Sequence, residues 1–261
     1  MKKIDWKKLK ENILDVIYPK HIKCIFCDEE LNEDAHNDTC VECLHRLPFI
    51  MHGCPKCGGI IDDNNTGVCD TCKRNMNTYY FDEAKSVFVY MDEVVSLVHN
   101  YKIKNIRYLS EPIGKYLAER FVTWGINVDY ITAVPLHENR EKQRWFNQAR
   151  EMALVVSELV NVPYIDCVKK VVDNKRQASL DMNERKTNVI DAYKFDSGYK
   201  DRIKNKNVLL IDDVFTTGAT TNEVSKVLKH AGAKAVFILT FAHSVLGDFE
   251  NVRQKLSNKK L

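Results

Sequence analysis

The sequence predicts an α/β protein in which a parallel sheet flanked by helices follows a small zinc-binding domain. Two observations predict this class. Eight of the nine cysteines lie between residues 24 and 72, as four pairs with two residues between their members. After about residue 80, short apolar runs alternate with helical patterns. Runs that are apolar on both faces are typical of parallel strands covered by helices on two sides.

The change in composition divides the chain into four predicted parts. Residues 1–19 read as an amphipathic helix ended by Pro19, with apolar residues at roughly helical spacing. Residues 20–78 form the cysteine-rich double zinc-ribbon domain, 79–247 the α/β domain and 248–261 a basic tail. No apolar run reaches the ~18 residues of a membrane span. The basic start lacks the apolar stretch of a signal peptide, so we expect a cytoplasmic protein.

Bulk composition restricts the function only weakly. The 261 residues are 44% hydrophobic, which is enough for a sizeable core. The net charge of +3 does not by itself indicate a nucleic-acid-binding protein. The clusters of lysine at both ends of the chain read first as solvated surface.

The paired cysteines predict two structural zinc sites. Two thiolates separated by two residues can face one ion, and two such pairs give a tetrahedral set. The loops joining the first and second pairs and the third and fourth pairs contain 12 and 11 residues. This regularity favours neighbouring pairs on each ion, although an interleaved pairing also satisfies the spacing. The predicted ligands are Cys24, Cys27, Cys40, Cys43, Cys54, Cys57, Cys69 and Cys72.

A disulfide framework is the alternative for these cysteines. It needs an oxidising compartment, for which the sequence shows no secretion signal. Four thiolates on each ion leave no coordination position open for catalysis, so the zinc ions should be structural. The ninth cysteine, Cys167, reads as a small buried apolar residue.

Alternating patterns place the elements of the α/β domain. Ligands of open parallel sheets bind at the carboxyl ends of the strands, so the residues after each strand are the candidates for a site. Predicted strands cover residues 84–90, 130–135, 208–211 and 235–241, and predicted helices cover 93–101, 112–124, 147–160 and 220–231.

The stretch VLLIDDVFTTGATT, residues 208–221, has the chemistry of a ribose-phosphate site. Gly218 lets the backbone approach a ligand, and the start of the following helix favours an anion. The spacing fits neither a P-loop nor a dinucleotide fingerprint. Asp212 and Asp213 would repel a phosphate unless they bind sugar hydroxyls or Mg²⁺. A plain helix N-cap explains one aspartate or one threonine, but not the whole string.

Three segments resemble known families. LLIDDVFTTGATT resembles the phosphoribosylpyrophosphate-binding signature of type I phosphoribosyltransferases. Residues 133–151, AVPLHENREKQRWFNQARE, resemble the VPxxxxRxxxRGFNQ segment of the ComF family of competence-associated proteins. An N-terminal cysteine cluster is also typical of that family. Gln177, Leu180, Arg185 and Asn188 match its QxxLxxxxRxxNxxxxF segment, with Tyr193 at the final aromatic position.

The chain departs from the family pattern at Trp145, which stands where glycine usually precedes FNQ. If that glycine lets backbone approach a ligand, the tryptophan puts this contact in doubt. The ring could instead stack on a base or ribose. A buried core tryptophan is the interpretation we favour.

The resemblance implies a type I phosphoribosyltransferase-like fold and a ligand, phosphoribosylpyrophosphate, held with Mg²⁺. Asp212 and Asp213 would bind the ribose hydroxyls. The candidate catalytic residues are these two and Arg185, which would offset pyrophosphate charge from a mobile loop at residues 176–185. The pyrophosphate would contact Pro135, Leu136 and His137. The 5′-phosphate would contact Thr216, Thr217, Gly218, Ala219, Thr220 and Thr221.

Three functions compete. The first is a transferase acting in DNA uptake during competence, with an unidentified acceptor. Residues 241–244, which follow the last predicted strand, could lie near this acceptor. We interpret His243 as a surface histidine. The second is a non-catalytic, zinc-containing single-stranded DNA-binding protein, whose basic clusters and aromatic residues would hold the strand. The third is an adaptor that docks onto other uptake proteins, such as a helicase.

Overall fold

The computed structural model describes residues 21–61, 67–75, 78–173 and 191–245. The chain forms two compact units, Met1–Leu47 and Pro48–Leu261. The predicted N-terminal helix, the basic tail and the loop at residues 176–185 lie outside the described residues. The four domain bounds predicted from the sequence therefore stay predictions.

The smaller unit is organised around the first four cysteines. Helix α2, Val41–Arg46, begins directly after Cys40. Two isolated antiparallel bridges, Lys23–Glu30 and His36–Thr39, close turns in this cysteine segment. Buried Cys24, Cys40 and Cys43 pack with Phe26 and Leu31, so the apolar core of this unit is small.

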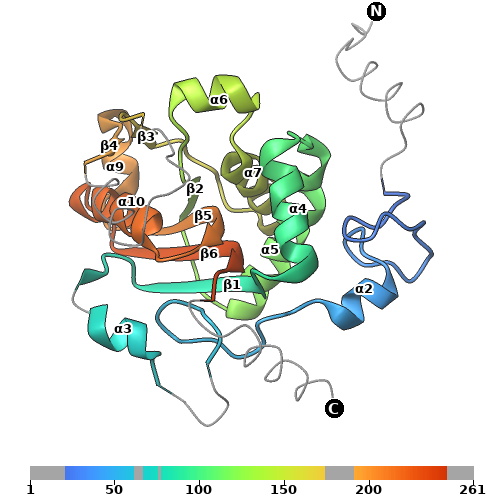
Figure 1. Cartoon of the computed structure of the whole chain (residues 1–261). Helices are drawn as coiled ribbons and strands as arrows, with labels where there is room; N and C mark the ends of the chain where they lie inside the picture. Colours follow the sequence, from blue (N-terminus) through green and yellow to red (C-terminus); the bar gives the residue numbers. More distant parts are fainter. Residues whose placement is uncertain (1–20, 62–66, 76–77, 174–190, 246–261) are drawn as a thin grey trace, which may run out of the picture. The chain divides into compact units, whose positions relative to one another are not determined.

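The larger unit is built on a four-stranded sheet, visible in Figure 1. Its strands are β1 (Glu83–Val89), β2 (Tyr130–Ala133), β5 (Asn207–Phe215) and β6 (Ala235–His243). They lie in the order β1-β6-β5-β2 and all pairs are parallel. A separate antiparallel pair joins β3 (Val168–Lys170) and β4 (Tyr193–Phe195).

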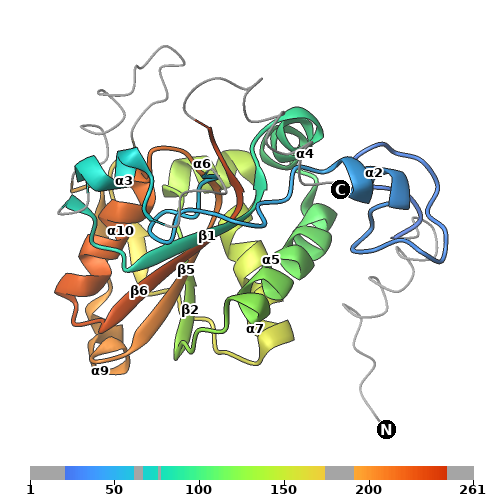
Figure 2. The ribbon, with the colours of Figure 1, turned by 90° about the horizontal axis from the view of Figure 1, so that it is seen from below.

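Helices cover both faces of this sheet, as Figure 2 shows. On one face α5 (Ser110–Trp124) packs on β1 and β6, and α7 (Gln148–Val160) packs on β2 and β5. On the other face α10 (Ala219–His230) packs on β5 and β6. The remaining helices are α3 (Asp70–Asn75), α4 (Asp92–Ile103), α6 (Glu138–Arg144) and α9 (Lys200–Ile203), with short 3-10 turns at Arg107–Leu109 and Ser197–Tyr199.

Burial explains why these segments form a parallel sheet. Val208, Leu209, Leu210 and Ile211 of β5 are fully buried, as are most side chains of β6. Strands that are apolar on both faces need cover on both, and helices supply it. The predicted α/β class, with its parallel sheet, flanking helices and two cysteine clusters, is confirmed.

The second cysteine segment belongs to the larger unit and packs on β1. The N–H of Ile50 donates to the Val87 carbonyl at 2.9 Å, and that of Ala84 donates to the Lys56 carbonyl at 2.8 Å. Gly58 has a φ of 74°, and a Cβ there would lie 2.6 Å from the Ala84 carbonyl oxygen. The backbone of the segment therefore approaches the strand too closely for a side chain at this position.

This packing makes the second cysteine cluster part of the main core. Cys54, Cys57 and Cys72 share one apolar cluster with Phe81 and Phe215 and with buried residues of β5 and β6. Among the described residues, no helix is long and apolar enough to cross a membrane.

Candidate functional site

The eight paired cysteines form two four-thiol clusters. Cys24, Cys27, Cys40 and Cys43 make the first, and Cys54, Cys57, Cys69 and Cys72 the second, with all Sγ atoms of a cluster within 4.8 Å of one another. Neighbouring pairs therefore share a site, and the interleaved arrangement is excluded.

The sulfur spacing in both clusters fits zinc. The Sγ atoms of Cys27 and Cys40 lie 3.7 Å apart, and those of Cys57 and Cys69 lie 3.8 Å apart. Tetrahedral zinc with bonds of about 2.3 Å places two sulfurs about 3.8 Å apart. A disulfide needs about 2.05 Å. The clusters are thus two tetrahedral zinc-binding sites of structural type.

Asp212 and Asp213 lie within β5 rather than after it. The strand runs four residues beyond the predicted segment 208–211, because Asp212 and Val214 continue to pair with Thr240 and Ala242 of β6. The two carboxylates still lie near the carboxyl end of the strand.

Each aspartate has a different electrostatic environment. Asp213 forms an ion pair with Lys102 of α4, with 2.7 Å between Asp213 Oδ1 and Lys102 Nζ. The N–H of Asp213 donates to Asp212 Oδ1 at 2.9 Å. Burial, and then the charge of Asp213, raise the pKa of Asp212 to about 7. Asp212 therefore carries a carboxylate that a cation or a pair of hydroxyl donors would stabilise.

The loop after β5 leads directly into α10. Gly218 is the N-cap residue of α10, with a φ of 74°. It has no side chain to cap the helix, so the N–H groups of the first turn beyond Ala219 stay available to another acceptor. The Thr217 hydroxyl accepts from the Ala219 N–H at 3.4 Å, and the Thr221 hydroxyl donates to the Gly218 carbonyl at 3.1 Å. We call residues 216–221 the phosphate loop.

Pro135, Leu136 and His137 follow β2, which pairs with β5. The N–H of Val134 donates to the Ile211 carbonyl at 3.0 Å, which places this segment beside the start of the aspartate pair. His137 caps α6 by accepting from the Asn139 N–H at 3.3 Å. The structure thus brings the predicted pyrophosphate segment and the aspartates to the same edge of the sheet.

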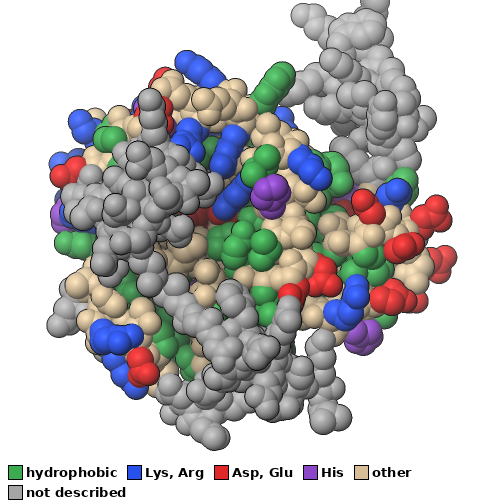
Figure 3. Space-filling view, in the orientation of Figure 1, with side chains coloured by type: hydrophobic (Ala, Val, Ile, Leu, Met, Phe, Trp, Pro, Cys, Tyr) green, Lys and Arg blue, Asp and Glu red, His purple; other side chains and the backbone are tan. Residues whose placement is uncertain are grey.

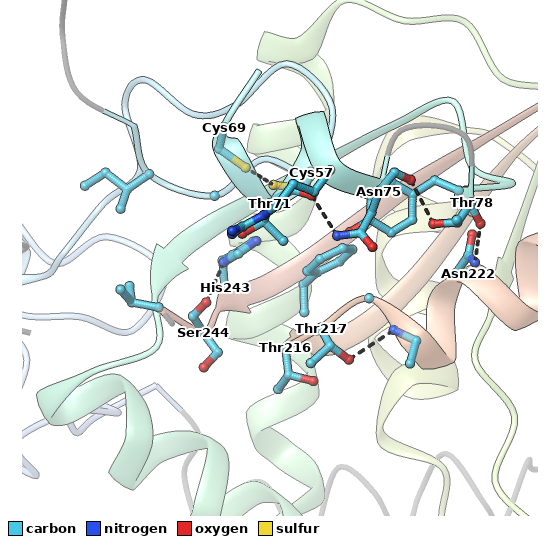
Figure 4. Close-up of a pocket in the computed structure, with 18 of the residues that line it drawn as sticks. Cys57, Cys69, Thr71, Asn75, Thr78, Thr216, Thr217, Asn222, His243 and Ser244 are labelled. Carbon is cyan, nitrogen blue, oxygen red and sulfur yellow. Dashed lines mark hydrogen bonds between the residues drawn. The ribbon is translucent and has the colours of Figure 1, made fainter. Parts of the chain in front are cut away.

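A pocket of about 740 Å³ lies between the phosphate loop and the second cysteine segment, as Figure 4 shows. Residues Thr216–Ala219 line one side of it. The other side is lined by the second cysteine segment and the residues that follow it: Cys57, Gly59, Ile60, Cys69, Thr71, Arg74, Asn75, Thr78 and Tyr79.

His243 lines the same pocket and is not the surface histidine that the sequence suggested. Its ring stacks on Phe215 with centroids 5.0 Å apart, and a Cβ on Gly59 would meet it at 2.7 Å. Nδ1 lies 2.8 Å from the Ser244 carbonyl, whereas the buried Nε2 has no hydrogen-bond partner among the described residues. Burial lowers the pKa of His243 to about 4, so the ring is neutral at pH 7.

Comparisons with known proteins agree with these features. Residues 13–73 match the family model of the double zinc ribbon domain. The chain is 26% identical over 230 residues to Competence protein F of Haemophilus influenzae, covering 86% of this chain and 98% of that protein. It is 28% identical over 236 residues to Competence protein ComFC of Streptococcus pneumoniae, covering 82% and 97%. These matches support a ComF-family protein.

The solved structures similar to this ComF-family protein include phosphoribosyltransferases. Adenine phosphoribosyltransferase from Thermoanaerobacter pseudethanolicus aligns with a TM-score of 0.34 and 17% identity. The alignment covers 56% of this chain and 78% of that protein.

The tryptophan at the usual glycine position of the ComF family is exposed, and the prediction of a buried core residue was wrong. Trp145 is 86% exposed. It ends α6 in a left-handed conformation, with a φ of 66°. Glycine adopts this conformation without strain, whereas a residue with a Cβ does not. The structure thus gives a backbone reason for glycine at this position.

Replacing Trp145 by glycine should stabilise this ComF-family protein by about 0.5–1 kcal/mol, because relief of left-handed strain exceeds the added entropy of the unfolded chain. Urea unfolding measures the change. Trp145→Ala is the matched control, since it removes the ring but keeps the Cβ that causes the strain. A glycine variant no more stable than the alanine variant would contradict this reading.

Several residues singled out in the sequence have structural roles or lie outside the described residues. Cys167 is fully buried, as expected, and burial raises the pKa of its thiol to about 11. Arg150, near the end of the segment 133–151, pairs with Glu141 and with Asp166. Arg185 and the rest of the predicted mobile loop fall outside the described residues, so their catalytic role stays a prediction. The sequence did not predict Lys102 or the cysteine-segment wall of the pocket as parts of the site, because only tertiary packing brings them there.

Proposed function

We propose that this ComF-family protein binds phosphoribosylpyrophosphate with Mg²⁺ and acts as a phosphoribosyltransferase-like protein in DNA uptake. One observation carries the proposal: a single turn connects a carboxylate pair on β5 to the uncapped start of α10. Carboxylates suit the ribose diol, and the helix start suits its phosphate. The competence proteins to which the chain is similar support the biological setting.

Each part of the ligand has a partner in this assignment. Asp212 and Asp213 orient the ribose through its hydroxyls, and the phosphate loop holds the 5′-phosphate. The pyrophosphate lies toward Pro135, Leu136 and His137. Lys and Arg side chains gather on the face between α6 and α4 in Figure 3, where α6 carries Arg140 and Arg144. Their charge favours a ligand with several phosphates.

The transfer itself would break the bond between the ribose C1 and pyrophosphate and form a bond from C1 to the acceptor. Charge develops on the departing pyrophosphate, so preorganised donors and cations near it lower the barrier. Arg185 is the residue we assign to this step. Mg²⁺, when bound, would neutralise part of the phosphate charge, and the raised pKa of Asp212 suits a carboxylate that acts beside a cation.

Calorimetric titration of the protein with phosphoribosylpyrophosphate and Mg²⁺ tests the proposal. We expect binding by the wild type and none by the Asp212→Ala, Asp213→Ala double variant. Glu158→Ala with Asp201→Ala is the matched control, because it removes two exposed acids from other helices and should bind as the wild type does. A wild type that gives no binding heat would overturn the proposal.

Turnover is tested by the same mixture with a panel of nucleobases while pyrophosphate release is followed. We expect release above the background with the acceptor that fits, and none from the double aspartate variant. Binding without release from any acceptor would make the protein a sensor of its ligand rather than a transferase.

A single-stranded DNA-binding role is the second candidate, and the similarity to competence proteins favours it. Binding through phosphate contacts loses affinity steeply as salt rises. DNA affinity at several salt concentrations therefore tests this role, and no binding at low salt removes it. An adaptor for other uptake proteins, such as a helicase, is the remaining alternative. Zinc held by thiolates is suited to a reducing compartment, so we place the protein in the cytoplasm.

A further inference from the structure

We propose that Arg74 and Thr71, on the helix held by the second zinc site, bind the phosphate from the side opposite the phosphate loop. This inference rests on the proposed function and adds a second wall to its ligand site. That wall is helix α3 and its neighbours, which face residues Thr216–Ala219 across the pocket. The second zinc site would then shape a ligand site as well as stabilise a fold.

Hydrogen bonds join the residues that follow the second cysteine segment to α10, the helix that begins at the phosphate loop. Asn222, one turn into α10, donates from Nδ2 to the Thr78 carbonyl at 3.0 Å. Its Oδ1 accepts from the Tyr80 N–H at 2.6 Å. Within the wall, Asn75 Nδ2 donates to the Thr71 carbonyl at 2.8 Å, and the Thr78 hydroxyl donates to the Asn75 carbonyl at 2.8 Å. Helix α10, which starts at the phosphate loop, thus holds the opposite wall of the pocket in place.

The pocket between these walls holds a polar group that lacks a partner. The buried Nε2 of His243 makes no hydrogen bond among the described residues. Burying an unpaired polar atom costs free energy, so a ligand or a water bound there would compensate it. The pocket volume of about 740 Å³ lies within the range of small-molecule sites, roughly 300–1,000 Å³.

Charge explains why an arginine is needed on this wall. Zinc with four thiolates carries a net charge of about −2. Cys57 and Cys69 line the pocket, so an anion at the phosphate loop would be repelled from this side. Arg74 is the only Lys or Arg among the described residues that line the pocket. Its guanidinium can offset the thiolate charge and bind two phosphate oxygens at once.

Among the described residues that line the pocket, Glu223 is the one acid, and its carboxylate is already engaged. Its Oε1 lies 3.2 Å from the Asp191 N–H and 3.4 Å from Lys226 Nζ. Arg74 is thus the cation in this wall, and Thr71 adds a hydroxyl donor one turn earlier on α3.

Titration of the full, zinc-loaded chain with phosphoribosylpyrophosphate and Mg²⁺ tests the inference. We expect Arg74→Gln to weaken binding at least tenfold and Thr71→Val about threefold. Lys73→Gln is the matched control: it removes the same charge from the next residue, whose ammonium lies 3.2 Å from Asp70 and which does not line the pocket. It should change affinity less than twofold.

Two further readouts separate the possible outcomes. Zinc released by thiol modification should stay at two ions per chain in all three variants, which shows that their folds are intact. Ribose 5-phosphate, which lacks pyrophosphate, should also bind more weakly to Arg74→Gln. Loss of affinity for phosphoribosylpyrophosphate alone would place Arg74 at the pyrophosphate and overturn our assignment. Equal affinities of Arg74→Gln and Lys73→Gln would overturn it while the proposed function stands, and no binding by the wild type would overturn both.

Discussion

Replacing Asp212 by asparagine should raise the free energy of unfolding at pH 8 by about 2 kcal/mol while it abolishes binding of phosphoribosylpyrophosphate. Burial and the neighbouring Asp213 raise the pKa of Asp212 from 3.8 to about 7. Asparagine has no charge to bury, and its Oδ1 can still accept from the Asp213 N–H. Stability and ligand binding therefore make opposite demands on this residue.

The direction of the pH effect follows from proton binding. Between about pH 4 and pH 7 the native carboxyl keeps its proton and the unfolded one has lost it. The unfolded state binds fewer protons there, so the stability of the wild type falls as pH rises and levels off above about pH 7. A pKa that rises from 3.8 to about 7 sets an upper limit of about 4 kcal/mol, and partial exposure to solvent reduces this to about 2.

Urea unfolding at pH 5 and pH 8 measures the effect as a difference between variant and wild type. The free energy of unfolding of the Asp212→Asn variant should exceed that of the wild type by more at pH 8 than at pH 5. Asp201→Asn, an exposed acid of α9, is the control and should show no such difference. If the difference in free energy of unfolding between variant and wild type is the same at both pH values, Asp212 titrates like an exposed aspartate.

Adding one methyl group at Gly218 should cost about 2–4 kcal/mol of stability and weaken phosphate binding at least tenfold. The φ of 74° disfavours any residue with a Cβ. The new Cβ would also lie 2.5 Å from Phe215 Cζ. Phe215 is buried, stacks on His243 and meets Phe81 edge-on at 5.9 Å, so it has little room to move.

Gly125 offers a matched control for backbone strain alone. Its φ is 71°, but a Cβ there would meet no atom within 4 Å. Gly125→Ala should therefore cost only about 1 kcal/mol. The excess cost of Gly218→Ala over Gly125→Ala, measured by urea unfolding, reports the clash with Phe215. Equal costs would mean that Phe215 or the phosphate loop moves to accept the methyl group, which would contradict the predicted clash.

Much of the fold could be predicted because local patterns and tertiary structure agree. The apolar runs of β5 and β6 are buried on both faces, as their sequences indicated. The cysteine spacing predicted both zinc sites, and loop length favoured the correct pairing. The end of β5 was predicted four residues early, because Asp212 and Asp213 interrupt the apolar run although their backbone continues to pair with β6.

The rest of the site depends on contacts between segments far apart in the sequence. His243 is enclosed because Gly59 and Phe215 pack against its ring, and no local pattern marks that contact. Trp145 was expected inside because large aromatic residues usually are, but the left-handed end of α6 turns it outward. Lys102 reaches Asp213 from a helix more than a hundred residues earlier.

The shared core of the second zinc site and the sheet has a consequence for protein abundance in the cell. Cys54, Cys57 and Cys72 pack in one apolar cluster with strand residues. Structural zinc contributes about 10–16 kcal/mol in small domains, whereas whole domains are stable by only about 5–15 kcal/mol. Chains made during zinc shortage would therefore remain largely unfolded and be degraded. The steady-state level of the protein would then follow the supply of zinc.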